Sequence, residues 1–144
     1  GPQVMTGYWK KGYETELVFT SDGFFKTGDL GTMDPEGFVK IIDRKKDMIN
    51  ISGFNVYPNE VEQVVSSHSN VIECAVVGGL NNDNEEIVKL FVVVKNNSVS
   101  KKKLLQFCKE NLAAYKCPKE IIIKNELPKT NVGKLSRKTL REKI

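Results

Sequence analysis

Histidine and cysteine are scarce in this chain: its 144 residues include one histidine, His68, and three cysteines. The cysteines, Cys74, Cys108 and Cys117, are widely spaced and form no CxxC pair, and His68 completes no familiar zinc-binding spacing with them. The sequence therefore predicts neither a disulfide framework nor a metal site, and it favours a reducing compartment.

Long apolar runs are absent as well. The longest, such as residues 90–94, extend over a few residues, whereas a membrane-spanning helix needs about 18. The first residues have neither the basic start nor the apolar segment of a signal peptide. Because the chain starts with glycine and not with methionine, we expect it to begin partway through a longer protein.

The sequence also lacks the short motifs of a self-contained active site. It contains no GxxxxGK[ST] or GxGxxG phosphate-binding motif, no HExxH metal motif and no serine with an obvious partner base. His68 lies at the end of a predicted helix, where a surface role is expected. We therefore expect the chain not to carry a complete phosphate-binding or hydrolytic site of its own.

The composition is typical of a folded domain, with 40% apolar and 28% charged residues. The net charge of +4 is uneven, because residues 116–144 hold nine basic and three acidic side chains. A basic end suits a polyanion, such as nucleic acid, a membrane surface or a phosphate-rich small molecule, and it equally suits a solvated basic face. Aromatic residues are absent after Tyr115, which leaves no stacking platform for nucleic acid.

The first 47 residues predict turns and short strands. Strands are expected at residues 24–27 and 38–42, with the tip of a hairpin at residues 34–37. Few apolar residues occur here, so we expect this segment to pack against another part of a larger structure. The charged run at residues 43–47 separates it from a more regular second part.

The second part predicts a small two-layer α+β domain, with a three-stranded sheet flanked by helices plus a β-hairpin. We expect the hairpin at residues 48–57, strands at 71–77, 87–94 and 121–123, loops at 78–84 and 128–133, and helices at 58–68, 100–112 and 135–144. Ser100 and Ser136 are the predicted N-caps of the last two helices. The loop at residues 128–133 is expected to be irregular and extended.

Three segments carry side chains suited to chemistry. Asp29 follows a glycine at the end of a predicted strand, where a carboxylate can accept two hydrogen bonds from a ribose; a turn aspartate is the alternative. The run at residues 43–47 suits a hinge or a surface cluster of ion pairs. Lys134 follows a glycine, where its ammonium can meet negative charge developing on a phosphate or carboxylate; a solvated lysine is the alternative.

These segments, in this order, resemble one family. The matching stretches are residues 1–9, 25–29, 43–49, 52–62, 115–118 and 128–134. The chain is similar to the C-terminal part of an adenylate-forming enzyme, of the superfamily that includes acyl-CoA synthetases, luciferases and peptide-synthetase adenylation domains. Asp-Arg-Lys-Lys-Asp-Met-Ile at residues 43–49, with Ser-Gly-Phe-Asn-Val-Tyr-Pro-Asn-Glu at 52–60, most resembles bacterial long-chain fatty-acid–CoA ligases.

The resemblance implies a reaction in two steps and a two-part chain. A carboxylate attacks the α-phosphate of ATP and forms an acyl-adenylate, and the thiol of coenzyme A then takes the acyl group. Residues 1–45 would be the end of a large N-terminal domain. Residues 46–144 would be a mobile C-terminal domain, which rotates between the steps about a hinge at residues 43–47.

The resemblance also implies a role for each candidate residue. Lys134 would bridge the carboxylate and the α-phosphate during adenylation. Asp29 would hold the ribose hydroxyls, and Arg44 would assist at the ribose or phosphate. Lys46 would be the pivot of the hinge, and Gly53 would lie against the pantetheine arm of coenzyme A, where a side chain would block the channel.

The implied ligands are ATP, Mg²⁺, coenzyme A and a fatty acid, and the implied enzyme is cytoplasmic or peripheral at the inner membrane. In the family the phosphate loop, the magnesium ligand and the acyl pocket belong to the N-terminal domain, so the chain alone is expected to be inactive. Nucleic acid is not an expected partner. Two alternatives stay open: another carboxylate substrate, as in an aryl-CoA ligase, luciferase-like enzyme or peptide-synthetase domain, and a non-enzymatic basic module that binds nucleic acid or protein.

Overall fold

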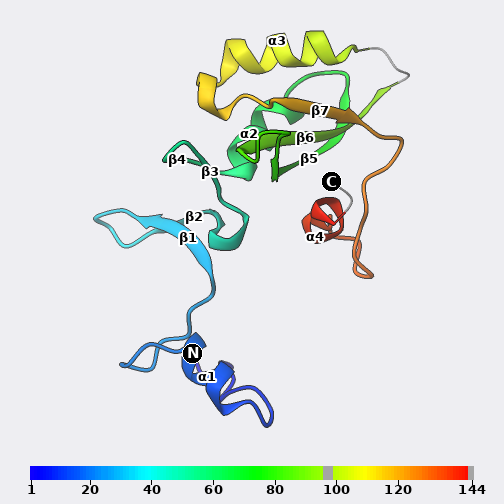
Figure 1. Ribbon diagram of the computed structural model, residues 1–144. Helices are drawn as coiled ribbons and strands as arrows, with labels where there is room; N and C mark the ends of the chain where they lie inside the picture. Colours follow the sequence, from blue (N-terminus) through cyan, green and yellow to red (C-terminus); the bar gives the residue numbers. More distant parts are fainter. Residues whose placement is uncertain (96–98, 143–144) are drawn as a thin grey trace. The chain divides into compact units, whose positions relative to one another are not determined.

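The computed structural model describes residues 1–95 and 99–142 and divides the chain into two compact units, Gly1–Lys45 and Lys46–Ile144 (Figure 1). The division falls inside the charged run at residues 43–47. Each unit has its own secondary structure and is described by itself.

The first unit holds one short helix and one hairpin. Helix α1 is Gly12–Val18, and strands β1 (Asp29–Met33) and β2 (Val39–Arg44) pair antiparallel. The hairpin tip forms as predicted, because a carboxylate oxygen of Asp34 accepts the backbone N–H groups of Glu36 and Phe38 at 3.0 and 2.9 Å. No apolar residue of this unit is buried, in line with the few apolar residues in its sequence.

Two expectations for this unit are wrong. The strand predicted at residues 24–27 is reduced to a single bridge between Phe19 and Phe25, and Asp29 therefore begins β1 and does not follow a strand. Helix α1 was not expected. It buries none of its residues and has no side-chain N-cap, so it lacks the apolar periodicity and the capping residue by which a helix is predicted.

The second unit is the α+β domain that the sequence predicts. Its main sheet has the order β5-β6-β7, with β5 (Val71–Leu80) antiparallel to β6 (Glu86–Val94) and β7 (Glu120–Ile123) parallel to β6. The remaining elements are η1 (Lys45–Asp47), β3 (Ile49–Ile51), β4 (Phe54–Val56), α2 (Pro58–Ser66), α3 (Lys101–Asn111), η3 (Ala114–Lys116) and α4 (Arg137–Arg141). Both predicted N-caps are confirmed, because the Ser100 and Ser136 hydroxyls accept the N–H groups of Lys103 and Thr139.

Apolar side chains cover both faces of the main sheet. Alternate residues of a strand point to opposite faces, so Val76 and Leu90 join the core with α2 and α3, while Val77 and Phe91 pack with Leu140 of α4. Figure 1 shows α3 and α4 on opposite sides of the sheet. The nearly continuous apolar sequence of β6 follows from this burial on two faces.

Strand β5 continues through a stretch that was expected to be a loop. Gly78 and Gly79 lie within it, because each leaves room for a side chain of the neighbouring strand. A Cβ atom on Gly79 would lie 2.7 Å from Cε of Lys89, and one on Gly78 would lie 2.8 Å from Oε1 of Glu86. Lys89 is buried and pairs with Glu120 of β7 at 3.0 Å, so these glycines serve close packing and not a turn.

The core thiol Cys108 gives the domain a predictable sensitivity to alkali. The pKa of Cys108 is raised from 9.0 to about 11, first because burial disfavours the thiolate and then because of the neighbouring thiols of Cys117 and Cys74. Between these pH values the folded chain keeps a proton that the unfolded chain loses. The free energy of unfolding should therefore fall by about 2–3 kcal/mol as the pH rises from about 9 to about 11.

Urea unfolding followed by circular dichroism at about pH 8 and about pH 10.5 measures this loss. The Cys108→Ala variant, compared with its own value at the lower pH, should lose less stability than the wild type. An equal loss in both chains would show that Cys108 does not titrate as its burial requires.

Candidate functional site

The predicted catalytic residue Lys134 lies in a tight turn and not in an extended loop. The N–H of Gly133 donates to the carbonyl oxygen of Thr130 at 2.8 Å, and the N–H of Thr130 donates to that of Lys134 at 2.6 Å. Lys129 and Leu135 form a bridge at the base of the turn. The left-handed conformation of Gly133, with φ of 78°, closes the turn, and Lys134 is exposed beside it. We call residues 129–135 the lysine turn.

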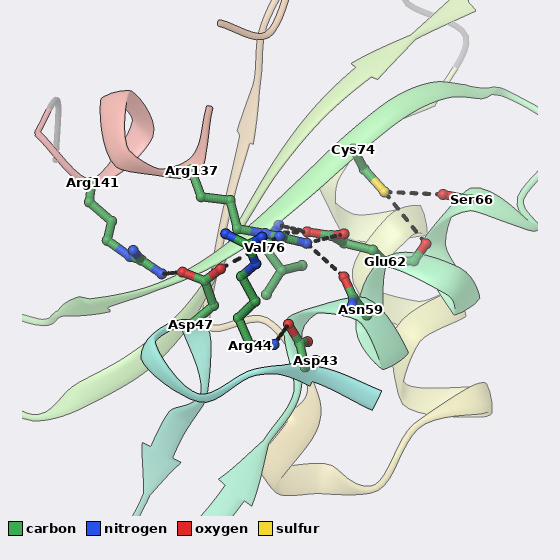
Figure 2. A network of polar contacts seen from close by, with 10 residues as sticks. All are labelled: Asp43, Arg44, Asp47, Asn59, Glu62, Ser66, Cys74, Val76, Arg137 and Arg141. Atoms are coloured by element: carbon green, nitrogen blue, oxygen red, sulfur yellow. Dashed lines mark hydrogen bonds and ion pairs between the residues drawn. The ribbon is translucent and has the colours of Figure 1, made fainter. Parts of the chain in front are cut away.

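Helix α4 comes directly after the lysine turn and is hydrogen-bonded to α2 through Arg137 (Figure 2). Nε and one terminal nitrogen of Arg137 donate to the two carboxylate oxygens of Glu62 at 3.2 and 2.7 Å. The same terminal nitrogen donates to the side-chain oxygen of Asn59 at 2.8 Å. The arginine therefore uses its planar fork on a single carboxylate, the strongest arrangement for such a pair.

The same helix also forms ion pairs with the buried carboxylate of Asp47 in η1. Arg141 donates to one oxygen of Asp47, and another nitrogen of Arg137 lies 3.8 Å from the second oxygen (Figure 2). The sequence suggested only a basic helix here. The available signal was the four-residue spacing of Arg137 and Arg141, which places both on one helix face, but their partners cannot be read from it.

Glu62 has a further contact that fixes the outer strand β5. Its Oε1 accepts the N–H of Val76 at 2.8 Å, and beside it Sγ of Cys74 lies 3.3 Å from Oγ of Ser66. One carboxylate thus connects α2, β5 and α4.

Asp29 and Arg44 are brought together at the open end of the β1–β2 hairpin. They are paired residues in the register of the two strands, and Nε of Arg44 lies 3.6 Å from Oδ1 of Asp29. Gly28, with φ of 78°, directly precedes Asp29. A ligand with both hydroxyl and phosphate groups could use this carboxylate and guanidinium together.

Lys46 and Gly53 occupy two further turns. Lys46 lies exposed in η1, between Lys45 and the buried Asp47. Ser52 and Gly53 form the two-residue connection between β3 and β4, with φ values of 49° and 90°. A Cβ atom on Gly53 would meet no atom within 4 Å, so the positive φ alone explains why this position needs glycine.

A cavity lies beside this β3–β4 turn. It has a volume of about 530 Å³ and is lined by Ile51, Ser52, Tyr115 and Lys119 among others. The ring of Tyr115 stacks on that of Phe54 with 5.0 Å between the centroids.

Two further findings concern the described residues alone. Within residues 1–95 and 99–142, no three His, Cys, Asp or Glu side chains come together in a group that could hold a metal ion. None of the helices in this part of the chain has the length and apolar character needed to cross a membrane.

Comparison with known proteins identifies the family. The profile of the AMP-binding enzyme C-terminal domain matches residues 60–134, which include most of α2, the main sheet and Lys134. The chain belongs to this family. The resemblance derived from the sequence motifs is thereby confirmed.

Curated proteins match this chain over nearly its whole length. It is 51% identical over 142 residues to a long-chain-fatty-acid–CoA ligase of Yersinia pestis, covering 99% of this chain and 25% of that protein. It is 41% identical over 143 residues to a 2-succinylbenzoate–CoA ligase of Listeria monocytogenes, covering 99% of this chain and 30% of that protein. The chain thus spans about a quarter of the length of the curated relatives it matches.

A solved structure has the same fold. The ATP-bound MatB from Rhodopseudomonas palustris is 38% identical and superposes with a TM-score of 0.93, over 99% of this chain and 29% of that protein. The α+β fold class predicted from the sequence is confirmed.

Proposed function

We propose that this chain is the C-terminal part of an AMP-forming fatty-acid–CoA ligase. The observation that carries the proposal is the 51% identity with a long-chain-fatty-acid–CoA ligase over 99% of this chain. Residues 1–45 then complete a larger N-terminal domain, and residues 46–144 form the domain that rotates against it, with the pivot at Lys46.

In the first step, a carboxylate oxygen of the fatty acid attacks the α-phosphorus of ATP and pyrophosphate leaves. Lys134 places its ammonium between the carboxylate and the α-phosphate, where negative charge gathers in the transition state. Its exposed position at the end of a tight turn supports this role. The carboxylate of Asp29 accepts hydrogen bonds from the ribose hydroxyls, and Arg44, on the paired strand, binds the ribose or a phosphate.

In the second step, the thiol of coenzyme A attacks the carbonyl carbon of the acyl-adenylate and AMP leaves. The rotation about Lys46 withdraws Lys134 and brings the β3–β4 turn to the reacting atoms. Gly53 then borders the pantetheine arm. ATP and coenzyme A are substrates, and Mg²⁺ accompanies ATP.

A second candidate substrate class is an aryl carboxylate, favoured by the 41% identity with a 2-succinylbenzoate–CoA ligase. The two classes differ in the acyl group, for which no pocket is proposed in this chain. The rest of the chemistry, including the role of Lys134, is the same for both.

The test uses the purified full enzyme with ATP, Mg²⁺ and coenzyme A, and with either palmitate or 2-succinylbenzoate. We expect AMP and palmitoyl-CoA, measured by mass spectrometry, to form at least tenfold faster than the aryl thioester, whereas the isolated chain should not catalyse ATP–pyrophosphate exchange. Faster aryl turnover would favour the second candidate. Turnover of neither acid would contradict the proposal.

A further inference from the structure

The lysine turn has a fixed shape, and its last residue, Leu135, is partly buried against the core cluster that includes Phe91 and Leu140. Its hydrogen bonds join residues 130, 133 and 134 to one another, and Asn131, Val132 and Gly133 at its tip are exposed. An outward contact, Lys129 to Glu73 at 3.1 Å, is a half-exposed ion pair and holds a position weakly. The position of Lys134 is therefore set from its C-terminal side, where Leu135 packs on the core and Arg137 begins α4.

Arg137 is three residues beyond Lys134 and adds a polar restraint to the packing of Leu135. Its side chain is 22% exposed, and those of Glu62 and Asp47 are 17% and 7% exposed. Water therefore competes weakly for these contacts, and a guanidinium held by two carboxylates and one amide oxygen has little rotational freedom. The charges of these four side chains also balance, because two cations, Arg137 and Arg141, face the carboxylates of Glu62 and Asp47.

One partner of Arg137 lies next to the pivot of the proposed rotation, and the other lies on α2, beyond the β3–β4 hairpin. Asp47 directly follows Lys46, and Glu62 belongs to α2. The arginine thus ties the lysine turn to the segment that the rotation would carry first. Displacement of a catalytic group by about 1 Å can cost about 10² in rate, so such a restraint has a direct effect on catalysis.

We propose that Arg137 is a positioning residue for adenylation: through Glu62 and Asp47 it holds the lysine turn on the segment after the pivot, so that Lys134 and this segment move as one body. This inference rests on the proposed role of Lys134. It assigns Arg137 no contact with substrate.

The experiment measures ATP–pyrophosphate exchange and thioester formation from supplied acyl-adenylate separately in the full enzyme. Arg137→Gln should lower kcat of exchange about tenfold or more with KM for ATP changed less than about twofold, because the lost interaction belongs to the transition state. Arg137→Lys, which keeps the charge but not the fork, should fall between it and the wild type. Lys138→Gln is the matched control, since it removes a charge from the exposed side of α4 and should leave both reactions unchanged.

The double variant Lys134→Ala/Arg137→Gln distinguishes positioning from general stabilisation. If Arg137 acts through Lys134, the double variant should be no more than about twofold slower in exchange than Lys134→Ala. If the rate losses of the two single variants multiply in the double variant, the inference is wrong. It is also wrong if Arg137→Gln and Arg137→Lys each lose both half-reactions equally. Either result leaves the proposed function standing. If Lys134→Ala itself leaves exchange intact, the role of Lys134 fails, and the inference fails with it.

Discussion

Replacing Lys134 with alanine in the full enzyme should slow adenylation by about 10²–10³-fold, equivalent to about 3–4 kcal/mol of transition-state stabilisation. The ammonium is the charge that we place between the carboxylate and the α-phosphate. Thioester formation from supplied acyl-adenylate should stay within about twofold of the wild type, because the proposed rotation has by then removed Lys134 from the reacting atoms. Pyrophosphate exchange and acyl-CoA formation measure the two steps separately.

Lys129→Ala is the matched control for this change. It removes the same charge from the base of the same turn, and the surface ion pair with Glu73 that it breaks contributes little to stability. Both half-reactions should survive it. Equal damage to both steps in Lys134→Ala would instead indicate lost folding or lost coenzyme A binding, and the adenylation role of Lys134 would be wrong.

Replacing Leu90 with alanine should lower the free energy of unfolding by about 2–5 kcal/mol. Leu90 is 0% exposed in β6, the central strand of the main sheet, and it belongs to the core with Val76 and Leu104. The cavity left by the truncated side chain cannot close easily, because neighbours hold this strand on both sides. Small domains are stable by about 5–15 kcal/mol, so urea unfolding should show a large shift.

Leu80→Ala provides the comparison within the same sheet. Leu80 ends β5 and is 57% exposed, so its truncation should change the free energy of unfolding by no more than about 0.5 kcal/mol. Equal free energies of unfolding in the two variants would show that the burial of Leu90 does not stabilise the domain as we expect.

The regular elements of the second unit were predictable because their signals are local. The valine spacing marks α2, Ser100 caps α3, and the dense apolar sequence marks β6. The prediction failed where glycine has a role other than forming a turn. Gly78 and Gly79 suggested a loop, yet they make room for Lys89 and Glu86 inside a strand, and only the register of β5 on β6 shows this.

The candidate site was predictable to a smaller degree. The motifs singled out Asp29, Arg44 and Lys134, and the structure pairs the first two across a hairpin and presents the third on a turn. Their roles stay proposals. Arg137 could not be assigned from sequence, because its partners Glu62 and Asp47 lie 75 and 90 residues away and no spacing rule connects positions so distant.

The hydrogen bond from the N–H of Val76 to Glu62 has a consequence for self-association. Strand β5 lies at the outer border of its sheet, where an unused backbone donor would invite a strand from a second molecule. Glu62 occupies this donor, and Arg137 donates to the same carboxylate. The acidic residue that binds Arg137 therefore also removes one backbone donor from this border of the sheet, and a strand from a second molecule cannot pair with Val76 without displacing Glu62.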